Sequence, residues 1–172
     1  MEQVILVDEN DQQIGLMEKM AAHEQALLHR AFSVFIFNSE GKMLLQQRAL
    51  NKYHSGGLWT NACCSHPRSN ENVIDAATRR LHEEMGFVTP IQPAFQFTYK
   101  TVFDNGLTEH EFDHVFIGTY DGEININPDE VENYGYGLVE DIELDIQQYP
   151  SIYTEWFKIA FPKVKNWLQQ NK

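Results

Sequence analysis

Stretches of apolar residues separated by short polar turns predict a set of β-strands. Residues 31–37 (AFSVFIF) and 43–48 are apolar and rich in strand-forming residues, and the NSEGK segment between them predicts a hairpin. Aromatic side chains alternate along residues 95–103, and the DNG sequence that follows predicts a turn. A second strand is expected to return over residues 112–120.

Apolar side chains also recur at helical spacing along residues 73–81. Ser69 or Asn70 is a suitable N-cap for this helix, and Gly86 is a suitable stop. A second helix is expected over residues 152–168, where Pro162 should kink or split it because proline lacks the backbone N–H.

Strands and helices interleave without a βαβ rhythm, so the pattern predicts an α/β (α+β) fold with a mixed β-sheet sandwiched between α-helices. No repeat, linker or change of composition divides the 172 residues. We therefore expect one catalytic domain over residues 1–172, with its core at about 30–165.

Composition and charge narrow the class of protein. Apolar residues make up 42% of the chain, and no apolar run approaches the roughly 20 residues that span a bilayer. The acidic N-terminal stretch lacks a basic n-region, and the two cysteines are adjacent, so a cytoplasmic protein without a structural disulfide is expected. A formal net charge of −12 argues against nucleic acid as a partner. An anionic substrate would need a local cluster of cations.

Three histidines and two glutamates are candidate ligands for a divalent metal. They are His23, His29, His66, Glu109 and Glu111. The two-residue spacing of the glutamates places both on one face of a strand, where two ligands can converge. Three imidazoles with two carboxylates would suit an octahedral ion. The alternative is that the histidines are ordinary surface residues and the glutamates a solvated strand face. His110 and His114 fit a surface or supporting role.

The segment 65–87 resembles the Nudix pattern. That pattern consists of a glycine, then a glutamate, and then a helix with the core sequence Arg-Glu-apolar-x-Glu-Glu-x-Gly-apolar. The matching residues are Glu71, Arg79, Leu81, Glu83, Glu84, Gly86 and Phe87. Ser65 replaces the first glycine and Arg80 replaces a glutamate. A guanidinium in place of a metal-binding carboxylate suits a phosphate better than a metal. Without this match in spacing, Glu83 and Glu84 would be interpreted as charged residues on the surface of a helix.

Together with this helix, four segments resemble the type I isopentenyl-diphosphate isomerases, a branch of the Nudix fold. They are LMEKMAAH (16–23), LLHRAFSVFIF (27–37), GLWTNACCSHP (57–67) and TEHEFDHVF (108–116), with QRAL and NK between them at 47–52. The resemblance extends over about residues 4–170 and is most specific in WTNACCSHP.

The resemblance implies a role for each matching residue. His23, His29, His66, Glu109 and Glu111 would bind Mn²⁺, Zn²⁺ or Mg²⁺, and Glu84, with the Cys64 carbonyl, would hold a Mg²⁺ that bridges to the diphosphate. The catalytic residues would be Cys64, Glu111 and Tyr99. Of the two adjacent cysteines, the Cys-x-His-Pro spacing selects Cys64. The substrate-binding residues would be Lys19, Arg48, Lys52, Ser65, Arg80 and Trp156.

The implied reaction interconverts isopentenyl and dimethylallyl diphosphate by a 1,3 proton shift through a tertiary carbocation. Those two diphosphates are the expected partners, and the chain is expected to act as a monomer or weak dimer with no obligatory protein partner. A Nudix hydrolase of a small diphosphate is the main alternative, although it would need a glutamate where Arg80 stands. A metal-dependent regulator or binding module is a second alternative, which predicts decay of the ligand residues.

Overall fold

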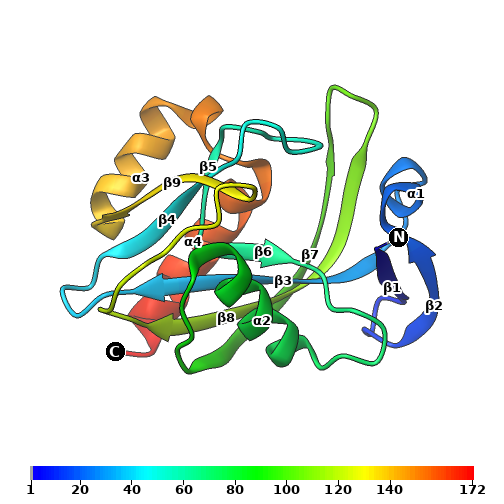
Figure 1. The fold of residues 1–172 in the computed structure, drawn as a ribbon, viewed down its shortest axis with the longest axis horizontal. Coiled ribbons are helices and arrows are strands. Elements are labelled where there is room, and N and C mark those ends of the chain that lie inside the picture. Colours follow the sequence, from blue (N-terminus) through cyan, green and yellow to red (C-terminus); the bar gives the residue numbers. More distant parts are fainter. Residues whose placement is uncertain (1) are drawn as a thin grey trace.

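The computed structural model describes residues 2–172, which form a nine-stranded mixed sheet and four α-helices (Figure 1). The strands are β1 (Gln3–Val7), β2 (Gln13–Glu18), β3 (His29–Phe37), β4 (Met43–Arg48), β5 (Trp59–Thr60), β6 (Cys63–Ser65), β7 (Ile91–Val102), β8 (Thr108–Thr119) and β9 (Val131–Gly137). The helices are α1 (Lys19–Glu24), α2 (Val73–Met85), α3 (Val139–Gln148) and α4 (Glu155–Gln170), with a 3₁₀ turn, η1 (Pro150–Ile152), before α4.

Strand β3 is the centre of the sheet. It pairs in parallel with β8 along its whole length, from His29 opposite Glu111 to Phe37 opposite Thr119, and antiparallel with the short β6. Strand β8 continues into the long antiparallel β7–β8 hairpin, whose tip lies beside α1 (Figure 1). Strands β5 and β9 each pair antiparallel with β4, and these three strands form another part of the sheet.

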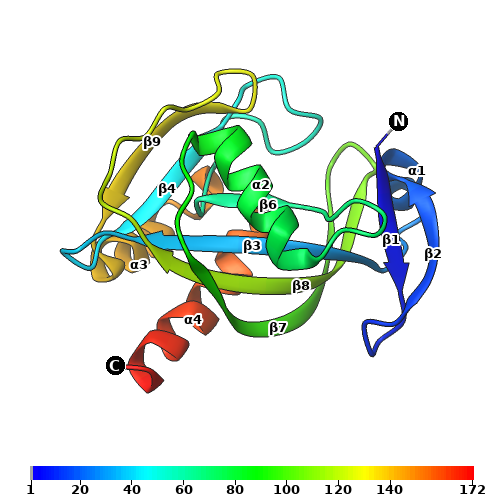
Figure 2. The same cartoon turned by 60° about the horizontal axis from the view of Figure 1, so that its bottom comes forward.

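Alternate residues of β3 build two hydrophobic cores. Phe32 and Val34 pack toward helix α2, while Phe35 and Phe37 pack toward α3 and α4. Successive side chains of a strand point to opposite faces, so one apolar strand serves both layers. Figure 2 shows α2 on one side of the sheet and α3 and α4 on the other. The expected mixed sheet between helices is confirmed.

The predicted hairpin of residues 31–37 and 43–48 is only partly present. Both strands form, and Asn38 N–H donates to the Lys42 carbonyl to close the turn. The strands then diverge, because Phe37 and Met43 are their only paired residues in the described chain. The ladder positions of β3 are occupied by β6 and β8 instead.

Helix ends differ from the sequence expectation in two places. Asn72, and neither Ser69 nor Asn70, is the N-cap of α2, while Gly86 ends the helix in the left-handed conformation (φ 76°) as predicted. Helix α4 begins three residues later than expected, where the Thr154 hydroxyl caps it, and it continues unbroken through Pro162. None of the helices in residues 2–172 is long and apolar enough to cross a membrane.

Candidate active site

Five predicted metal ligands converge where α1 meets the ends of β3, β6 and β8. One ligand atom from each of His23, His29, His66 and Glu111 lies within 4.8 Å of all the others, and these residues are buried. The Nε2 atoms of His29 and His66 lie 3.2 and 2.7 Å from Oε2 of Glu111. Nε2 of His23 lies 3.9 Å from Oε1 of Glu109. The fold therefore brings together residues that are 88 positions apart in the sequence (111 − 23).

The hydrogen bonds of His23 and His29 fix the protonation of their rings. Each ring places Nδ1 against a backbone carbonyl, that of Lys19 at 2.7 Å and that of Leu27 at 2.8 Å. A carbonyl only accepts, so Nδ1 carries the hydrogen and Nε2 of the neutral ring carries a lone pair. This is the usual arrangement of a metal-binding histidine. Nε2 of His23 is buried without a hydrogen bond. These lone pairs face carboxylates, so the donor set fits a divalent cation.

Tyr99 links the two glutamates. Its hydroxyl lies between Oε2 of Glu109, at 2.8 Å, and Oε1 of Glu111. Burial, together with the charges of both carboxylates, raises the pKa of Tyr99 well above its ordinary value, so the hydroxyl keeps its proton. Burial also raises the pKa of Glu111, but its contacts with His29 and His66 outweigh it and hold that pKa well below normal. Glu111 is therefore ionised, and Tyr99 is a proton donor beside it.

The strand alternation of β6 separates the two adjacent cysteines. Cys63 is fully buried in the core under α2, and its thiol donates to Glu84 at 2.9 Å. Cys64 points the other way and lines the cavity that also contains Tyr99 and Glu111. Burial raises the pKa of the Cys64 thiol, which lies 3.2 Å from Oδ1 of Asn61. Of the two thiols, Cys64 is thus the one that faces the candidate site, and it is held neutral.

A second, more polar cavity adjoins the first and shares Arg48, Tyr53, Cys64, Ser65 and His66 with it. It contains all the cations that were predicted to contact phosphate, together with the predicted magnesium ligand. These residues are Lys19, Arg48, Lys52, Arg80 and Glu84.

Carboxylates already pair with most of the cations in this polar cavity. Lys19 lies 3.4 Å from Glu2, and Arg80 contacts Glu84 at 3.5 Å and Glu130 at 3.3 Å. The polar cavity is therefore a network of opposite charges.

Trp156, from the first turn of α4, closes the apolar side of the first cavity. The indole is 3% exposed, and the Arg48 guanidinium carbon lies 5.1 Å from its ring centre. The first cavity has a volume of about 30 Å³ and the polar one about 70 Å³. Both are far smaller than the roughly 300 Å³ at the lower end of small-molecule sites, so a ligand must widen them.

The sequence interpretation missed three residues that line these cavities, Glu2, Tyr53 and His54, and of these only His54 belongs to a group of candidate metal ligands. It lies in the loop between β4 and β5, and its Nε2 is 3.2 Å from Oε1 of Glu109. No spacing or motif in YHSGG distinguishes His54 from a surface histidine. His54 forms a second group of candidate metal ligands with His23 and Glu109, beside the group of His23, His29, His66 and Glu111. His110 and His114 contact Ala26 and Asp11 and belong to neither group.

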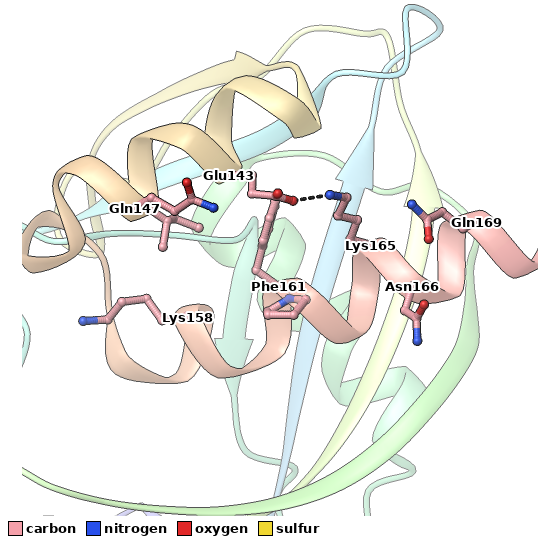
Figure 3. Close-up of a pocket in the computed structure, with 9 residues that line it drawn as sticks. Glu143, Gln147, Lys158, Phe161, Lys165, Asn166 and Gln169 are labelled. Atoms are coloured by element: carbon pink, nitrogen blue, oxygen red, sulfur yellow. Dashed lines mark hydrogen bonds and ion pairs between the residues drawn. The ribbon is translucent and has the colours of Figure 1, made fainter.

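A larger groove lies between α3 and α4, with a volume of about 420 Å³ (Figure 3). An ion pair of Glu143 with Lys165 crosses it, and Phe161 and Pro162 form part of its wall. None of the residues predicted from the sequence to act in catalysis or binding lines this groove. The candidate site is therefore the pair of smaller cavities around Cys64.

Comparison with known proteins agrees with this fold. Residues 27–157 match the NUDIX domain family. A crystal structure from Deinococcus radiodurans, 18% identical, superposes with a TM-score of 0.76 over 92% of this chain and 97% of that one. The MutT protein of Methanosarcina mazei, also 18% identical, gives a TM-score of 0.67 over 84% and 96%. The chain belongs to the Nudix family.

More similar relatives give a narrower assignment. Isopentenyl-diphosphate Delta-isomerase 2 of Aromatoleum aromaticum is 50% identical over 163 residues, which cover 95% of this chain and 86% of the relative. The isopentenyl-diphosphate Delta-isomerase of Pectobacterium atrosepticum is 49% identical over 170 residues, covering 99% and 95%. Within the Nudix family, the chain belongs to the isopentenyl-diphosphate Delta-isomerases, so the resemblance found in the sequence is confirmed.

Proposed function

We propose that this protein interconverts isopentenyl and dimethylallyl diphosphate, with Cys64 and the Tyr99–Glu111 pair moving the two protons. The observation that carries this proposal is the composition of one cavity. Proton carriers, a buried indole and candidate metal ligands surround it, and it adjoins a cavity that contains four cations. The Delta-isomerase relatives support the same substrates through their names.

The reaction needs two proton carriers around a flat alkene. One adds a proton to the terminal carbon, which gives a tertiary carbocation, and the other removes a proton from the carbon next to the CH₂–O group. We assign one role to the thiol of Cys64 and the other to Glu111 acting with the Tyr99 hydroxyl. These groups come from different strands, β6 on one side and the β7–β8 hairpin on the other. General acid–base catalysis requires such placed groups.

The buried histidines and glutamates would hold a divalent ion, Mn²⁺, Zn²⁺ or Mg²⁺. The candidate ligands are His23, His29, His66, Glu109 and Glu111. When bound, the ion would supply positive charge that polarises the Glu111 carboxylate and the Tyr99 hydroxyl that donates to it. Its ligands also fix the orientation of Glu111, because both His29 and His66 face the same carboxylate oxygen.

The diphosphate would lie in the polar cavity, against Lys19, Arg48, Lys52, Arg80 and Ser65. Glu84 would hold a Mg²⁺ ion, which would supply positive charge to the bound diphosphate. Burial already raises the pKa of Glu84, although Arg80 partly offsets this, so a bound cation would relieve a costly buried charge. Expelling Glu2 from its contact with Lys19 would open part of the space that the ligand needs.

Trp156 would stabilise the carbocation. An aromatic face attracts a desolvated cation by about 2 kcal/mol or more, which is worth more than about tenfold in rate. The indole is buried, so it also helps to exclude the water that would trap the cation as an alcohol.

Proton NMR in deuterated water tests the proposal directly. Protein loaded with Mg²⁺ and Mn²⁺ is incubated with isopentenyl diphosphate, and Cys64→Ala is compared with Cys63→Ala. We expect dimethylallyl diphosphate carrying deuterium in a methyl group, with loss of the reaction in Cys64→Ala and its retention in Cys63→Ala, because only Cys64 faces the cavity.

Three other outcomes would contradict the proposal in whole or in part. Release of phosphate or of the monophosphate without a double-bond shift would identify a Nudix hydrolase. Unchanged substrate with both ions present would favour a binding module. An equal loss of isomerisation in Cys64→Ala and Cys63→Ala would contradict the role assigned to Cys64 but not the proposed isomerase activity.

A further inference from the structure

His54 is a buried polar residue at the metal site that the proposed ligand set does not use. Its side chain is 2% exposed, and its Nε2 lies 3.2 Å from Oε1 of Glu109. The ring stacks on Phe103 with centres 4.4 Å apart and planes 16° apart, and it meets Trp156 edge to face at 5.6 Å. Packing on both sides thus fixes the imidazole in front of one carboxylate oxygen.

The Nδ1 contact of His54 differs from those of His23 and His29. Those two rings give their Nδ1 hydrogen to a backbone carbonyl, which leaves Nε2 free to ligate. Nδ1 of His54 instead lies 3.2 Å from the hydroxyl of Ser55, which is able to donate. With the Ser55 hydroxyl as the donor to Nδ1, the hydrogen of the neutral ring is on Nε2, which lies 3.2 Å from Oε1 of Glu109.

Glu109 needs such a donor. Its Oε2 accepts from Tyr99 at 2.8 Å. Its Oε1 faces both His23, at 3.9 Å, and His54, at 3.2 Å, and neither imidazole Nε2 forms a hydrogen bond of acceptable geometry. The 3.2 Å separation of His54 Nε2 from Oε1 is within hydrogen-bonding distance, and the 3.9 Å separation of His23 Nε2 is not. A carboxylate oxygen has two lone pairs and can serve both.

We propose that His54 is a positioning residue for the metal site, donating its Nε2 hydrogen to Oε1 of Glu109 and so orienting that carboxylate toward the ion. The inference rests on the metal site of the proposed function and adds one residue to it. Groups that orient metal ligands in this way typically change metal affinity by about 10- to 100-fold.

Two substitutions separate the hydrogen bond from the packing. His54→Phe keeps a ring against Phe103 and removes the donor. His54→Gln places an amide N–H₂ near the position of Nε2 and so restores the donor. His82→Phe, at an exposed histidine of α2, is the matched control. The dissociation constant and stoichiometry of Mn²⁺ are measured by titration calorimetry on chelator-treated protein, and circular dichroism verifies that each variant is folded.

We expect His54→Phe to raise the dissociation constant of Mn²⁺ by about 10- to 100-fold. His54→Gln and His82→Phe should bind close to the wild type, all with the same stoichiometry. If His54→Phe bound Mn²⁺ with wild-type affinity, the role of His54 would be overturned, but the proposed metal site would not. Weak binding by His54→Gln, or one fewer ion bound in His54→Phe, would overturn it by showing that His54 itself ligates. Absence of Mn²⁺ binding by the wild type would overturn the metal site and this inference together.

Discussion

Replacing Arg80 by methionine tests the idea that this residue has changed from the metal-holding role of its Nudix position to phosphate binding. The guanidinium of Arg80 lines the polar cavity and is 19% exposed. It contacts Glu83 at 2.6 Å, Glu130 at 3.3 Å and Glu84 at 3.5 Å. Methionine keeps most of the aliphatic stem and removes every one of these contacts.

The loss in stability should be moderate. Glu83 keeps Arg79 and Glu130 keeps Lys52, so only the buried Glu84 loses its main counter-charge. An unpaired buried charge can cost about 3–5 kcal/mol, but Glu84 can take up a proton instead, since burial already raises its pKa. We therefore expect a loss of about 1–3 kcal/mol in the free energy of unfolding.

The effect on substrate binding should be larger than the effect on turnover. A hydrogen bond to a charged group contributes about 1.5–3 kcal/mol, which corresponds to a rise of about 10- to 150-fold in KM. The assay is steady-state isomerisation of isopentenyl diphosphate at saturating Mg²⁺, with urea unfolding in parallel. Arg79→Met is the control, because Arg79 binds Glu71 and Glu83 and does not line the polar cavity.

The control should lose stability and keep the wild-type KM. If Arg80→Met also kept the wild-type KM, Arg80 would not bind the diphosphate. An equal rise of KM in both variants would show that the two arginines act only through the structure of α2.

Three further predictions concern stability. Removal of the metal by a chelator should lower the melting temperature by about 5–11 °C, since an ion at 100 times its dissociation constant adds about 2.7 kcal/mol; an unchanged calorimetric transition would argue against a structural contribution from the ion. Burial, with the charge of Glu111, raises the pKa of Asp113, so ionisation of this residue destabilises the folded wild type as the pH rises above 4. In the presence of a chelator, the free energy of unfolding of Asp113→Asn should therefore increase relative to that of the wild type by up to about 1.4 kcal/mol per pH unit above pH 4. A difference in urea stability that does not change with pH would refute this. Gly86→Ala should cost at least about 2 kcal/mol, because φ is 76° and the new Cβ would lie 2.2 Å from the Asn125 carbonyl oxygen. Gly106→Ala, at φ 85° with nothing within 4 Å, should show the smaller backbone cost alone.

Local patterns in the sequence were sufficient to predict the strands, turns and helix ends that depend on residues close together in the chain. The alternating residues 95–102 and the returning residues 112–119 both form strands, and the DNG turn joins them as expected. Gly86 ends α2 because glycine alone adopts the left-handed conformation without strain. By contrast, the parallel pairing of β3 with β8 joins positions about 80 residues apart in the chain, and no local pattern reports it.

Several elements were not predicted because their signals are weak. Helix α1 has six residues, too few for a clear period, and α3 follows β9 directly with an acidic first turn and one buried residue, Ile142. Pro162 was expected to kink or split the last helix. Packing of Phe157, Phe161 and Val164 on the sheet keeps the helix continuous around the missing N–H.

The candidate site was found through family resemblance more than through spacing. The pattern of His and Glu residues alone did not distinguish ligands from surface groups, and the structure supplies what was missing, namely burial and convergence. The alternation of β6 also separates Cys63 from Cys64, which the sequence could do only by alignment. His54 was missed because its contact with Glu109 depends on how the β4–β5 loop folds back.

The charges of the polar cavity explain how a protein of net charge −12 can hold a diphosphate. Its four cations are Lys19, Arg48, Lys52 and Arg80. Four carboxylates contact three of these cations, namely Glu2, Glu83, Glu84 and Glu130. When all eight groups are ionised, the four negative charges cancel the four positive charges, so the cations alone give little net attraction for an anion. A divalent ion at Glu84 would add two positive charges, and expelling Glu2 would remove one negative charge. On this reasoning, the affinity for diphosphate should depend more steeply on Mg²⁺ than on any single lysine.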